Sequence, residues 1–474
     1  MKDSTYFWII AAVVFLSRAP FVDAGYGIDP DAWRVVNSAH VITATHEYMA
    51  SRLPGNPLQE IVYSFFWNKQ PEYFNIATAF LSALGIASFG LTLKKIGSHD
   101  SILTALALAC TPVVYINSVN SMDYMWALSF VLGSLYCVVL SRPLAAGILL
   151  GMAVGCRITS GAMVIPFGMI ILNNRTEKGL PLKEITKFLA GALVVGAIAF
   201  LPVMIKYGPG FFTFVDGYPS FGEIIRSATI EVWGIVGCIA LLFAVIVSTF
   251  AKRASDDIAS FVRPIPPVYV AASMTAILLY VVAFLRLPGE AGYLIPALPF
   301  VFLLLTRFVH RTVFRIVCIS VIASSFFVSL DSIDRQWSVK PSPFSVSFLT
   351  GGRRLACDFL KGPIFNDYFR RKERMKFADH ILSFTEGRTT RGVIVSGSWL
   401  PQLAVTAGSV LPENTERNAS FTHGQTAFVG LLDKAYIMRC QNDGYDIFYI
   451  KGQEVENKEL YGIDLRNFGA QEIQ

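Results

Sequence analysis

The feature that most constrains this chain is a series of about eleven apolar segments that fill its first two thirds. A helix needs about 20 apolar residues to cross a bilayer, and most of the segments approach that length. They lie at about residues 5–22, 75–93, 101–116, 124–140, 143–156, 158–172, 186–205, 228–250, 266–285, 291–306 and 312–330. This series predicts a polytopic α-helical membrane protein with about eleven transmembrane helices.

The composition excludes several classes of protein. Hydrophobic residues make up 53% of the 474 residues, charged residues only 16%, and the mean hydropathy is +0.51. An ordinary soluble domain carries about 25% charged residues. We therefore do not expect a soluble enzyme, a disordered chain or a nucleic-acid-binding protein. The formal net charge of +6 is too small to indicate a partner.

The end of the chain differs from the rest, because charged residues become frequent after residue 330. We expect a transmembrane domain over residues 1–330 and a soluble C-terminal α/β domain over residues 331–474. Within the second domain the patterns predict an amphipathic helix at 367–386, a strand at 391–397, and a hairpin formed by 435–440 and 446–452. Cys357 and Cys440 either pair in an oxidising compartment or remain thiols.

Charge in the loops orients the chain. One set of loops, which includes Lys94, Lys95 and Arg142, carries more lysine and arginine and is expected in the cytoplasm. An odd number of spans then places the C-terminal domain on the outer side. The longest outer loop, at about 23–74, carries aromatic residues that suit helices lying in the membrane interface. We expect a bacterial inner membrane protein with a cytoplasmic N-terminus and a periplasmic or extracellular C-terminal domain.

The sequence Gly25 to Arg34 follows the first span and contains two carboxylates. Asp29 and Asp31 flank Pro30, which stiffens the loop, and Arg34 lies one turn after Asp31 if a helix starts here. A carboxylate beside a water-filled cleft can accept a proton from a hydroxyl, and an arginine beside it can bind an anion. The same residues could instead cap a helix N-terminus.

Arg52 stands before the rigid sequence Leu-Pro-Gly-Asn-Pro. An arginine on a stiff loop at the level of the lipid headgroups is well placed to bind a phosphate. It could equally extend its side chain to the headgroups and have no binding role.

Further polar residues stand at the predicted outer ends of later spans. Asp123 lies in a short turn before an apolar span, where it either has a partner or caps the helix. Arg157 lies in the turn between two short segments. Arg286 and Glu290 precede Tyr293, whose hydroxyl could donate to a phosphate oxygen or whose ring could anchor at the interface.

Together these motifs resemble the GT-C superfamily of glycosyltransferases that use polyprenyl-phosphate-linked sugars. The closest branch contains the protein O-mannosyltransferases and the lipid A aminoarabinose transferase. In that branch an Asp-Glu pair follows the first helix and a basic residue comes three positions after the Asp, which matches Asp31-Ala-Trp-Arg34. The later matches are Arg52-Leu-Pro-Gly-Asn-Pro57, Asp123 before a helix, and Tyr293-Leu-Ile-Pro296. Ala32 replaces the Glu of the family and Asp29 is additional, so the choice of base between the two aspartates and the use of a metal stay open.

The resemblance implies transfer of a sugar from a polyprenyl-phosphate carrier to a hydroxyl of a glycan, lipid or protein acceptor at the outer membrane face. Asp31 would be the general base, and Asp29 would tune it or bind the sugar. The residues expected to bind donor or phosphate are Arg34, Arg52, Asp123, Arg157, Arg286, Glu290 and Tyr293. Displacement with one base would invert the anomeric carbon. No cofactor is expected to be required, although a divalent metal is possible.

Three other functions fit parts of the sequence. A transporter or flippase of a lipid-linked or anionic solute would have charges deep within its spans and paired broken helices. A glycan polymerase or ligase would share the outer arginines but would not need the aspartate of the first loop. A non-catalytic receptor or scaffold would act through the C-terminal domain alone.

Overall fold

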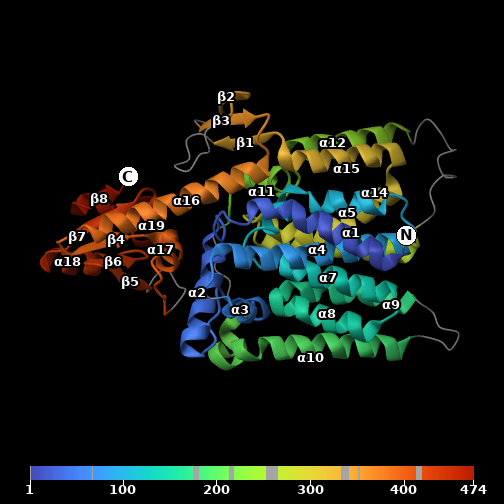
Figure 1. Cartoon of the computed structure of the whole chain (residues 1–474), viewed down its shortest axis with the longest axis horizontal. Coiled ribbons are helices and arrows are strands. Elements are labelled where there is room, and N and C mark those ends of the chain that lie inside the picture. Colours follow the sequence, from blue (N-terminus) through green and yellow to red (C-terminus); the bar gives the residue numbers. More distant parts are fainter. Residues whose placement is uncertain are drawn as a thin grey trace.

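The computed structural model describes residues 2–66, 68–173, 181–212, 218–251, 265–332, 341–350, 353–412 and 419–473. Trp67 and Asp216, which the sequence places in outer loops, lie outside these residues. The chain forms a bundle of apolar helices and a C-terminal part that contains two small sheets (Figure 1). The N-terminus lies at the end of the bundle that is remote from the C-terminal part.

The helices of the bundle coincide with the predicted apolar segments. They are α1 (Asp3–Arg18), α4 (Pro71–Lys95), α5 (Ser101–Ala109), α6 (Pro112–Asn117), α7 (Tyr124–Val139), α8 (Pro143–Cys156), α9 (Val164–Asn173), α10 (Leu182–Tyr207), α12 (Ile230–Ala251), α13 (Pro267–Arg286), α14 (Leu298–Phe308) and α15 (Arg311–Phe326). Among the described residues, six helical segments are long and apolar enough to cross a membrane. The chain is therefore an integral membrane protein, and the number of eleven spans stays a prediction.

The predicted continuous span at 101–116 is wrong in one respect, because α5 and α6 are separate helices. Thr111 has an extended backbone, and Pro112 is the first residue of α6. The ring of a proline disfavours the helical conformation for the residue before it and removes one backbone donor. The same residue type begins α4, α8 and α13, where it costs no hydrogen bond because the first N–H groups of a helix lack intrahelical partners.

Helices α8 and α10 pack closely through small residues. A Cβ atom at Gly147 would lie 2.1 Å from the carbonyl oxygen of Phe188, and one at Gly151 would lie 2.9 Å from that of Ala192. Small residues allow two helix backbones to approach in this way in a membrane, where the hydrophobic effect does not drive helices together. This contact fixes α8, which ends at Cys156, directly before Arg157.

Two helices lie across the end of the bundle between α1 and α4. These are α2 (Pro30–Thr45) and α3 (Pro57–Ser64), in the predicted long loop (Figure 1). Trp33 of α2 is 1% exposed, and its indole nitrogen donates to the carbonyl oxygen of Gly27 at 3.0 Å. The loop that carries Asp29 and Asp31 is thus anchored to its own helix.

The C-terminal part begins directly after α15. Strands β1 (Ser329–Ser332), β2 (Ser345–Thr350) and β3 (Arg353–Asp358) form an antiparallel sheet in the order β1-β3-β2. The long helix α16 (Pro363–Glu386) connects it to a second sheet in the order β5-β6-β4-β7-β8. The strands of this second sheet are β4 (Gly392–Val395), β5 (Ser420–His423), β6 (Thr426–Val429), β7 (Asp446–Ile450) and β8 (Gln471–Ile473).

The second sheet is covered on both faces. Strand β4 runs parallel to both β6 and β7, and all four of its residues are buried. Parallel strands buried on both faces form apolar runs rather than alternating ones, as Val393, Ile394 and Val395 do. The accompanying helices are α17 (Leu400–Thr406), α18 (Lys434–Asn442) and α19 (Gln453–Tyr461). The expected α/β character of this part is confirmed.

The predicted hairpin at 435–452 is wrong, because its first half is helix α18. Asp433 caps this helix by accepting from the backbone N–H of Tyr436 at 2.7 Å. Ile437 and Cys440, three residues apart, are the positions that α18 buries. Gly444 has a φ of 73° and lies in the turn before β7. A cap, a three-residue spacing and a turn glycine together favour a helix over a strand.

The C-terminal part is attached to the loop helices of the bundle. The side-chain amide of Asn37 in α2 donates to the carbonyl oxygen of Leu411 at 3.1 Å and accepts from its N–H at 2.9 Å. The seven cysteines are free thiols in this structure, so Cys357 and Cys440 do not pair.

Candidate active site

Asp29 is the N-cap of α2, so part of the capping interpretation is correct. Its carboxylate accepts from the backbone N–H of Asp31 at 2.8 Å, and Pro30 is the first helical residue. Burial, followed by the charges of Asp31 and Glu290, raises the pKa of Asp29 to about 7. A carboxylic acid that titrates near neutral pH is suited to exchange protons.

Asp31 projects from the first turn of α2 and contacts two arginines. One carboxylate oxygen accepts from Arg34, one turn later, and the other lies 3.0 Å from Nη1 of Arg52. Arg52 Nη1 is also 3.6 Å from a carboxylate oxygen of Glu290. The two motifs predicted from the long loop therefore meet, and Arg52 bridges Asp31 and Glu290.

The loop that carries Arg52 is held by a buried residue for which we predicted no role. Glu60 of α3 is 0% exposed and accepts from the backbone N–H of Ser51 at 2.7 Å and from its hydroxyl at 2.5 Å. The Tyr48 hydroxyl donates to its other oxygen. Burial raises the pKa of Glu60. An acidic residue eight positions after Arg52 gives no sequence signal of this role, since the contact depends on how α3 packs.

Asp123 stands at the N-cap of α7 but makes no capping hydrogen bond, so the capping interpretation is wrong here. Its carboxylate instead lies 2.5 Å from Nη1 of Arg157. The Arg157 guanidinium also packs on the rings of Tyr124 and Tyr293, with distances of 4.0 Å and 4.4 Å to the ring centres. A cation between two aromatic faces is held in one orientation.

Glu290 and Arg286 are the remaining predicted residues of the site. The Tyr124 hydroxyl donates to Glu290, which connects the Arg157 cluster to the Arg52 cluster. Arg286, the last residue of α13, is exposed, and none of the ion pairs found among the described residues involves it. A cation in this setting can bind an anion without first breaking an ion pair.

Most of these residues line one cavity, which we call the first cavity, with about 930 Å³ of free space, open solvent included. Its wall contains three arginines and three carboxylates from the sequence prediction, together with Tyr293. The members are Asp31, Arg52, Asp123, Arg157, Arg286, Glu290 and Tyr293. Arg34 reaches the cavity through its contact with Asp31.

Asp29 lines a neighbouring cavity, the second cavity, with about 1350 Å³ of free space, open solvent included. The two cavities share Met122, Tyr124 and Glu290 as lining residues. The second cavity lies between the bundle and the C-terminal part. Its charged and amide residues are Asp29, Asn117, Asn120, Arg226, Glu231, Glu290, Asp331, Asn366, Asp367 and Arg370. Eight of the nine residues singled out from the sequence thus line two adjoining cavities, and the ninth, Arg34, contacts Asp31.

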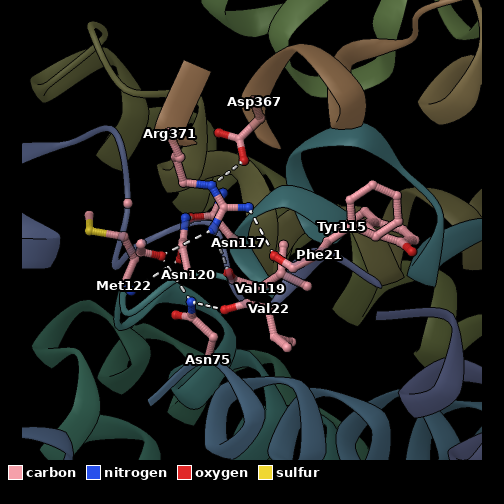
Figure 2. Close-up of polar contacts among 12 residues, drawn as sticks. Phe21, Val22, Asn75, Tyr115, Asn117, Val119, Asn120, Met122, Asp367 and Arg371 are labelled. Atoms are coloured by element: carbon pink, nitrogen blue, oxygen red, sulfur yellow. Dashed lines mark hydrogen bonds and ion pairs between the residues drawn. The ribbon is translucent and has the colours of Figure 1, made fainter. Parts of the chain in front are cut away.

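Residues of α16 fix the loops that carry the site (Figure 2). Arg371 is 2% exposed and donates to the carbonyl oxygens of Val119 at 2.8 Å, and of Gly25 and Phe21 at 3.4 Å. It forms an ion pair with Asp367, one turn earlier, at 2.8 Å. The basic sequence of the predicted amphipathic helix contained this residue, but nothing in the sequence shows which carbonyl groups it meets.

Asn75 of α4 strengthens the same junction. Its side-chain amide donates to the carbonyl oxygens of Val22 at 2.7 Å and Gly25 at 2.9 Å (Figure 2). Arg371 thus joins the segment before Asp29 to the segment before Asp123, and Asn75 fixes the first of these segments. The C-terminal part supplies Arg371, and the bundle supplies Asn75.

A metal site is not evident in the part of the chain that the structure describes, since no three His, Cys, Asp or Glu side chains there are grouped to hold an ion. Our expectation about cofactors stays a prediction.

Comparisons with known proteins gave two solved structures. No family model and no curated protein match the chain. A crystal structure of ArnT from Cupriavidus metallidurans bound to undecaprenyl phosphate is 14% identical, with a TM-score of 0.45, over 67% of this chain and 59% of that one. The apo structure of the same protein is 12% identical, with a TM-score of 0.41, over 86% of this chain and 84% of that one. The chain thus spans less than two thirds of the first structure, and at this identity the likeness says nothing about a substrate.

Proposed function

We propose that this protein is a GT-C-type integral membrane glycosyltransferase. It transfers a sugar from a polyprenyl-phosphate carrier to an acceptor hydroxyl at the outer face of the membrane, and the anomeric carbon inverts. The observation that carries the proposal is the position of Asp31, on the wall of an arginine-lined cavity and two residues from Asp29, which lines a second polar cavity.

The first cavity suits the phosphate of the donor. Arg52, Arg157 and Arg286 surround a space that is open to the ends of α8 and α13, and their guanidinium groups can bind phosphate oxygens. Polyprenyl phosphate leaves as an anion, so the reaction needs stabilisation of charge rather than protonation of the leaving group. The lipid tail would lie among the helices.

Asp31 is the proposed general base. In the structure it is paired with Arg34 and Arg52. A donor phosphate that takes over Arg52 would leave one carboxylate oxygen of Asp31 able to accept the acceptor's proton. Asp29, with its raised pKa, would change the charge beside Asp31 near neutral pH.

The second cavity suits a hydroxyl-bearing acceptor. Carboxylate and amide oxygens accept hydrogen bonds from hydroxyl groups, and this cavity has both near Asp29. The acceptor would then reach the reaction centre from the side opposite the donor phosphate, as direct displacement requires. We place both cavities on the periplasmic or extracellular side of a bacterial inner membrane, with the N-terminus in the cytoplasm.

A transporter of lipid-linked or anionic solutes is the alternative. Transport sites usually lie near the middle of the bilayer between broken helices. Here the charged residues of the site lie at helix ends: Asp123 at the start of α7, Arg157 after α8 and Arg286 at the end of α13. This position favours chemistry at the membrane surface.

The test uses purified wild type and Asp31→Asn in detergent with a panel of radiolabelled polyprenyl-phosphate sugars. The readout is release of polyprenyl phosphate, with and without candidate acceptors and with and without EDTA. Asp23→Asn is the matched control. Asp23 lies in the same loop but lines neither cavity, and its carboxylate is 2.8 Å from the ammonium group of Lys372. We expect turnover by wild type and the control but not by Asp31→Asn.

Normal turnover by Asp31→Asn would refute its role as the base. Wild type that binds every carrier in the panel and cleaves none would contradict the transferase and favour transport. Loss of activity with EDTA would establish a metal requirement.

A further inference from the structure

The sheet β1-β3-β2 exposes an apolar face. Val346 and Phe348 lie on one side of β2, and Phe344 directly precedes the strand; they are 57%, 44% and 66% exposed. The backbone N–H of Phe359 donates to the carbonyl oxygen of Phe344 at 3.1 Å, which continues the ladder by one residue. The register places Cys357 opposite Val346 and Leu355 opposite Phe348, so these β3 residues extend the same face. Side chains on a strand point alternately to the two faces, so this surface is one continuous side of the sheet.

The other face of the sheet is more polar and partly buried, although it also carries the exposed Leu349. Ser345 and Ser347 of β2 point to it, as do Ala356 and Asp358 of β3, both of which are buried. Asp358 accepts from the backbone N–H of Ser342 at 2.6 Å and from its hydroxyl at 2.7 Å. A sheet in water buries its apolar face and exposes its polar one. Here the arrangement is reversed, which indicates that something apolar covers the exposed face.

The position of the sheet relative to the bundle indicates what covers its apolar face. Helix α15 ends at Phe326 and β1 begins at Ser329, so the sheet starts where the last helix of the bundle stops. In Figure 1 the sheet lies beyond the ends of α12 and α15 and projects sideways past the bundle. Ile316 and Ile319 of α15 and Leu242 of α12 are exposed apolar residues on the adjoining helices. Phe327, which lies between α15 and β1, is also 51% exposed, so exposed apolar residues continue from the bundle to the start of the sheet.

The segments beside the sheet carry residues typical of a membrane surface. Phe359 and Leu360 follow β3 and are about half exposed, and Phe369 of α16 is 40% exposed. The ammonium group of Lys361 lies 5.5 Å from the ring centre of Phe369. Aromatic rings and lysines gather at the level of the headgroups, because one end of each is apolar and the other tolerates water or anions.

We propose that the face formed by Phe344, Val346 and Phe348 lies in the outer leaflet, at the boundary between headgroups and acyl chains, and that its occupant is lipid. The sheet then rests on the bilayer beside α12 and α15. Ser329 and Asp331 of the same sheet line the second cavity. Contact with lipid therefore holds one wall of that cavity at the membrane surface. The inference rests on the sheet and its position, and it does not depend on the proposed reaction.

The test replaces single residues of the full-length protein with the photo-crosslinking amino acid p-benzoylphenylalanine. Phe348→p-benzoylphenylalanine and Phe344→p-benzoylphenylalanine probe the face, and both keep an aromatic ring at an exposed position. Ser347→p-benzoylphenylalanine is the control, since Ser347 is an exposed neighbour on the opposite face of β2. The proteins are irradiated in nanodiscs made from one lipid of known mass, and adducts are identified by mass spectrometry.

We expect lipid adducts at positions 344 and 348, in several-fold excess over position 347. A lipid yield at 344 and 348 no higher than at 347 would overturn the proposal. So would adducts only with a second copy of the chain, or quenching by water without any adduct. A parallel irradiation in whole cells reports a protein partner as a heavier adduct, which would replace lipid as the occupant.

Discussion

The two cavities that meet beside α2 differ in their balance of arginines and carboxylates. The first has arginines from three different segments, Arg52, Arg157 and Arg286, facing one space. The second has only two arginines, Arg226 and Arg370, beside five carboxylates, whereas the first has three carboxylates beside its three arginines. Arginines are paired in both cavities, as Arg52 is with Asp31 and Arg226 is with Glu231. This difference fits the proposed donor phosphate in the first cavity and the proposed hydroxyl-bearing acceptor in the second, with Asp29 and Asp31 at the junction.

Substitution of Asp31 is expected to produce the largest effect on kcat, and substitution of Asp29 a smaller one. Loss of a general base lowers kcat by about 100-fold to 10,000-fold. We expect this loss for Asp31→Asn and a smaller one for Asp29→Asn, which retains a good N-cap residue for α2. Measurement of kcat and of KM for donor and acceptor distinguishes the effects of the two substitutions. The reverse order would make Asp29 the base.

Arg371 joins the C-terminal part to the segments that precede Asp29 and Asp123, so its substitution should destabilise the fold around both cavities. Arg371→Met leaves Asp367 buried without its ion pair, which costs about 3–5 kcal/mol in the free energy of unfolding. The control is Lys376→Met, an exposed position on the same helix, with an expected change within about 0.5 kcal/mol. Thermal unfolding in detergent measures both. An unchanged Tm for Arg371→Met would show that the junction does not stabilise the fold.

Glu60 offers a way to disturb the first cavity alone. Glu60→Ala leaves the Ser51 N–H and the Tyr48 hydroxyl without their acceptor, at a cost of about 1–3 kcal/mol. We expect a higher KM for the donor, little change in KM for the acceptor, and partial rescue by Glu60→Gln. An equal rise in both KM values would mean that Glu60 only stabilises the fold.

The titration of Asp29 should change the stability of the protein with pH, and this is the smallest of the expected effects. The pKa of Asp29 is about 7 in the folded protein, against about 4 for an unperturbed aspartate. Between these values the folded state holds a proton that the unfolded chain has lost, so the contribution of Asp29 to stability falls as pH rises. Asp29→Asn lacks this titration. Its Tm relative to wild type should therefore be higher at pH 8 than at pH 5, and equal differences at both would contradict the raised pKa.

Much of this arrangement could be predicted because it is local. Apolar segments of the right length indicate helices, and a carboxylate or arginine at the end of such a segment indicates a polar site at the membrane surface. Asp123 and Arg157 stand at such ends, whereas Asp31 and Arg52 stand near prolines in the long outer loop. The spacing could not show that Asp31 pairs with Arg52, or Asp123 with Arg157, since those contacts join separate helices.

The residues that were missed act through tertiary contacts. Arg371 is buried and donates to backbone carbonyl groups, which leave no trace in a sequence pattern. Glu60 is buried and accepts from one backbone N–H and two hydroxyl groups, and only the packing of α3 brings these donors to it. The wrong hairpin had a local cause, because the apolar residues of 435–440 fit a strand as well as a short helix until the cap at Asp433 is considered. The break before Pro112 had a sequence signal in the proline itself.

The most direct test of the central claim is the binding of polyprenyl phosphate without a sugar to three proteins in nanodiscs: wild type, Arg52→Gln and Arg226→Gln. The two arginines are well matched, since each lies near a carboxylate and their side chains are 35% and 36% exposed. We predict that Arg52→Gln raises the Kd about tenfold or more, as expected for loss of a charged hydrogen bond, while Arg226→Gln leaves it unchanged. Equal weakening by both substitutions, or weakening by Arg226→Gln alone, would contradict the assignment of the first cavity to the donor phosphate.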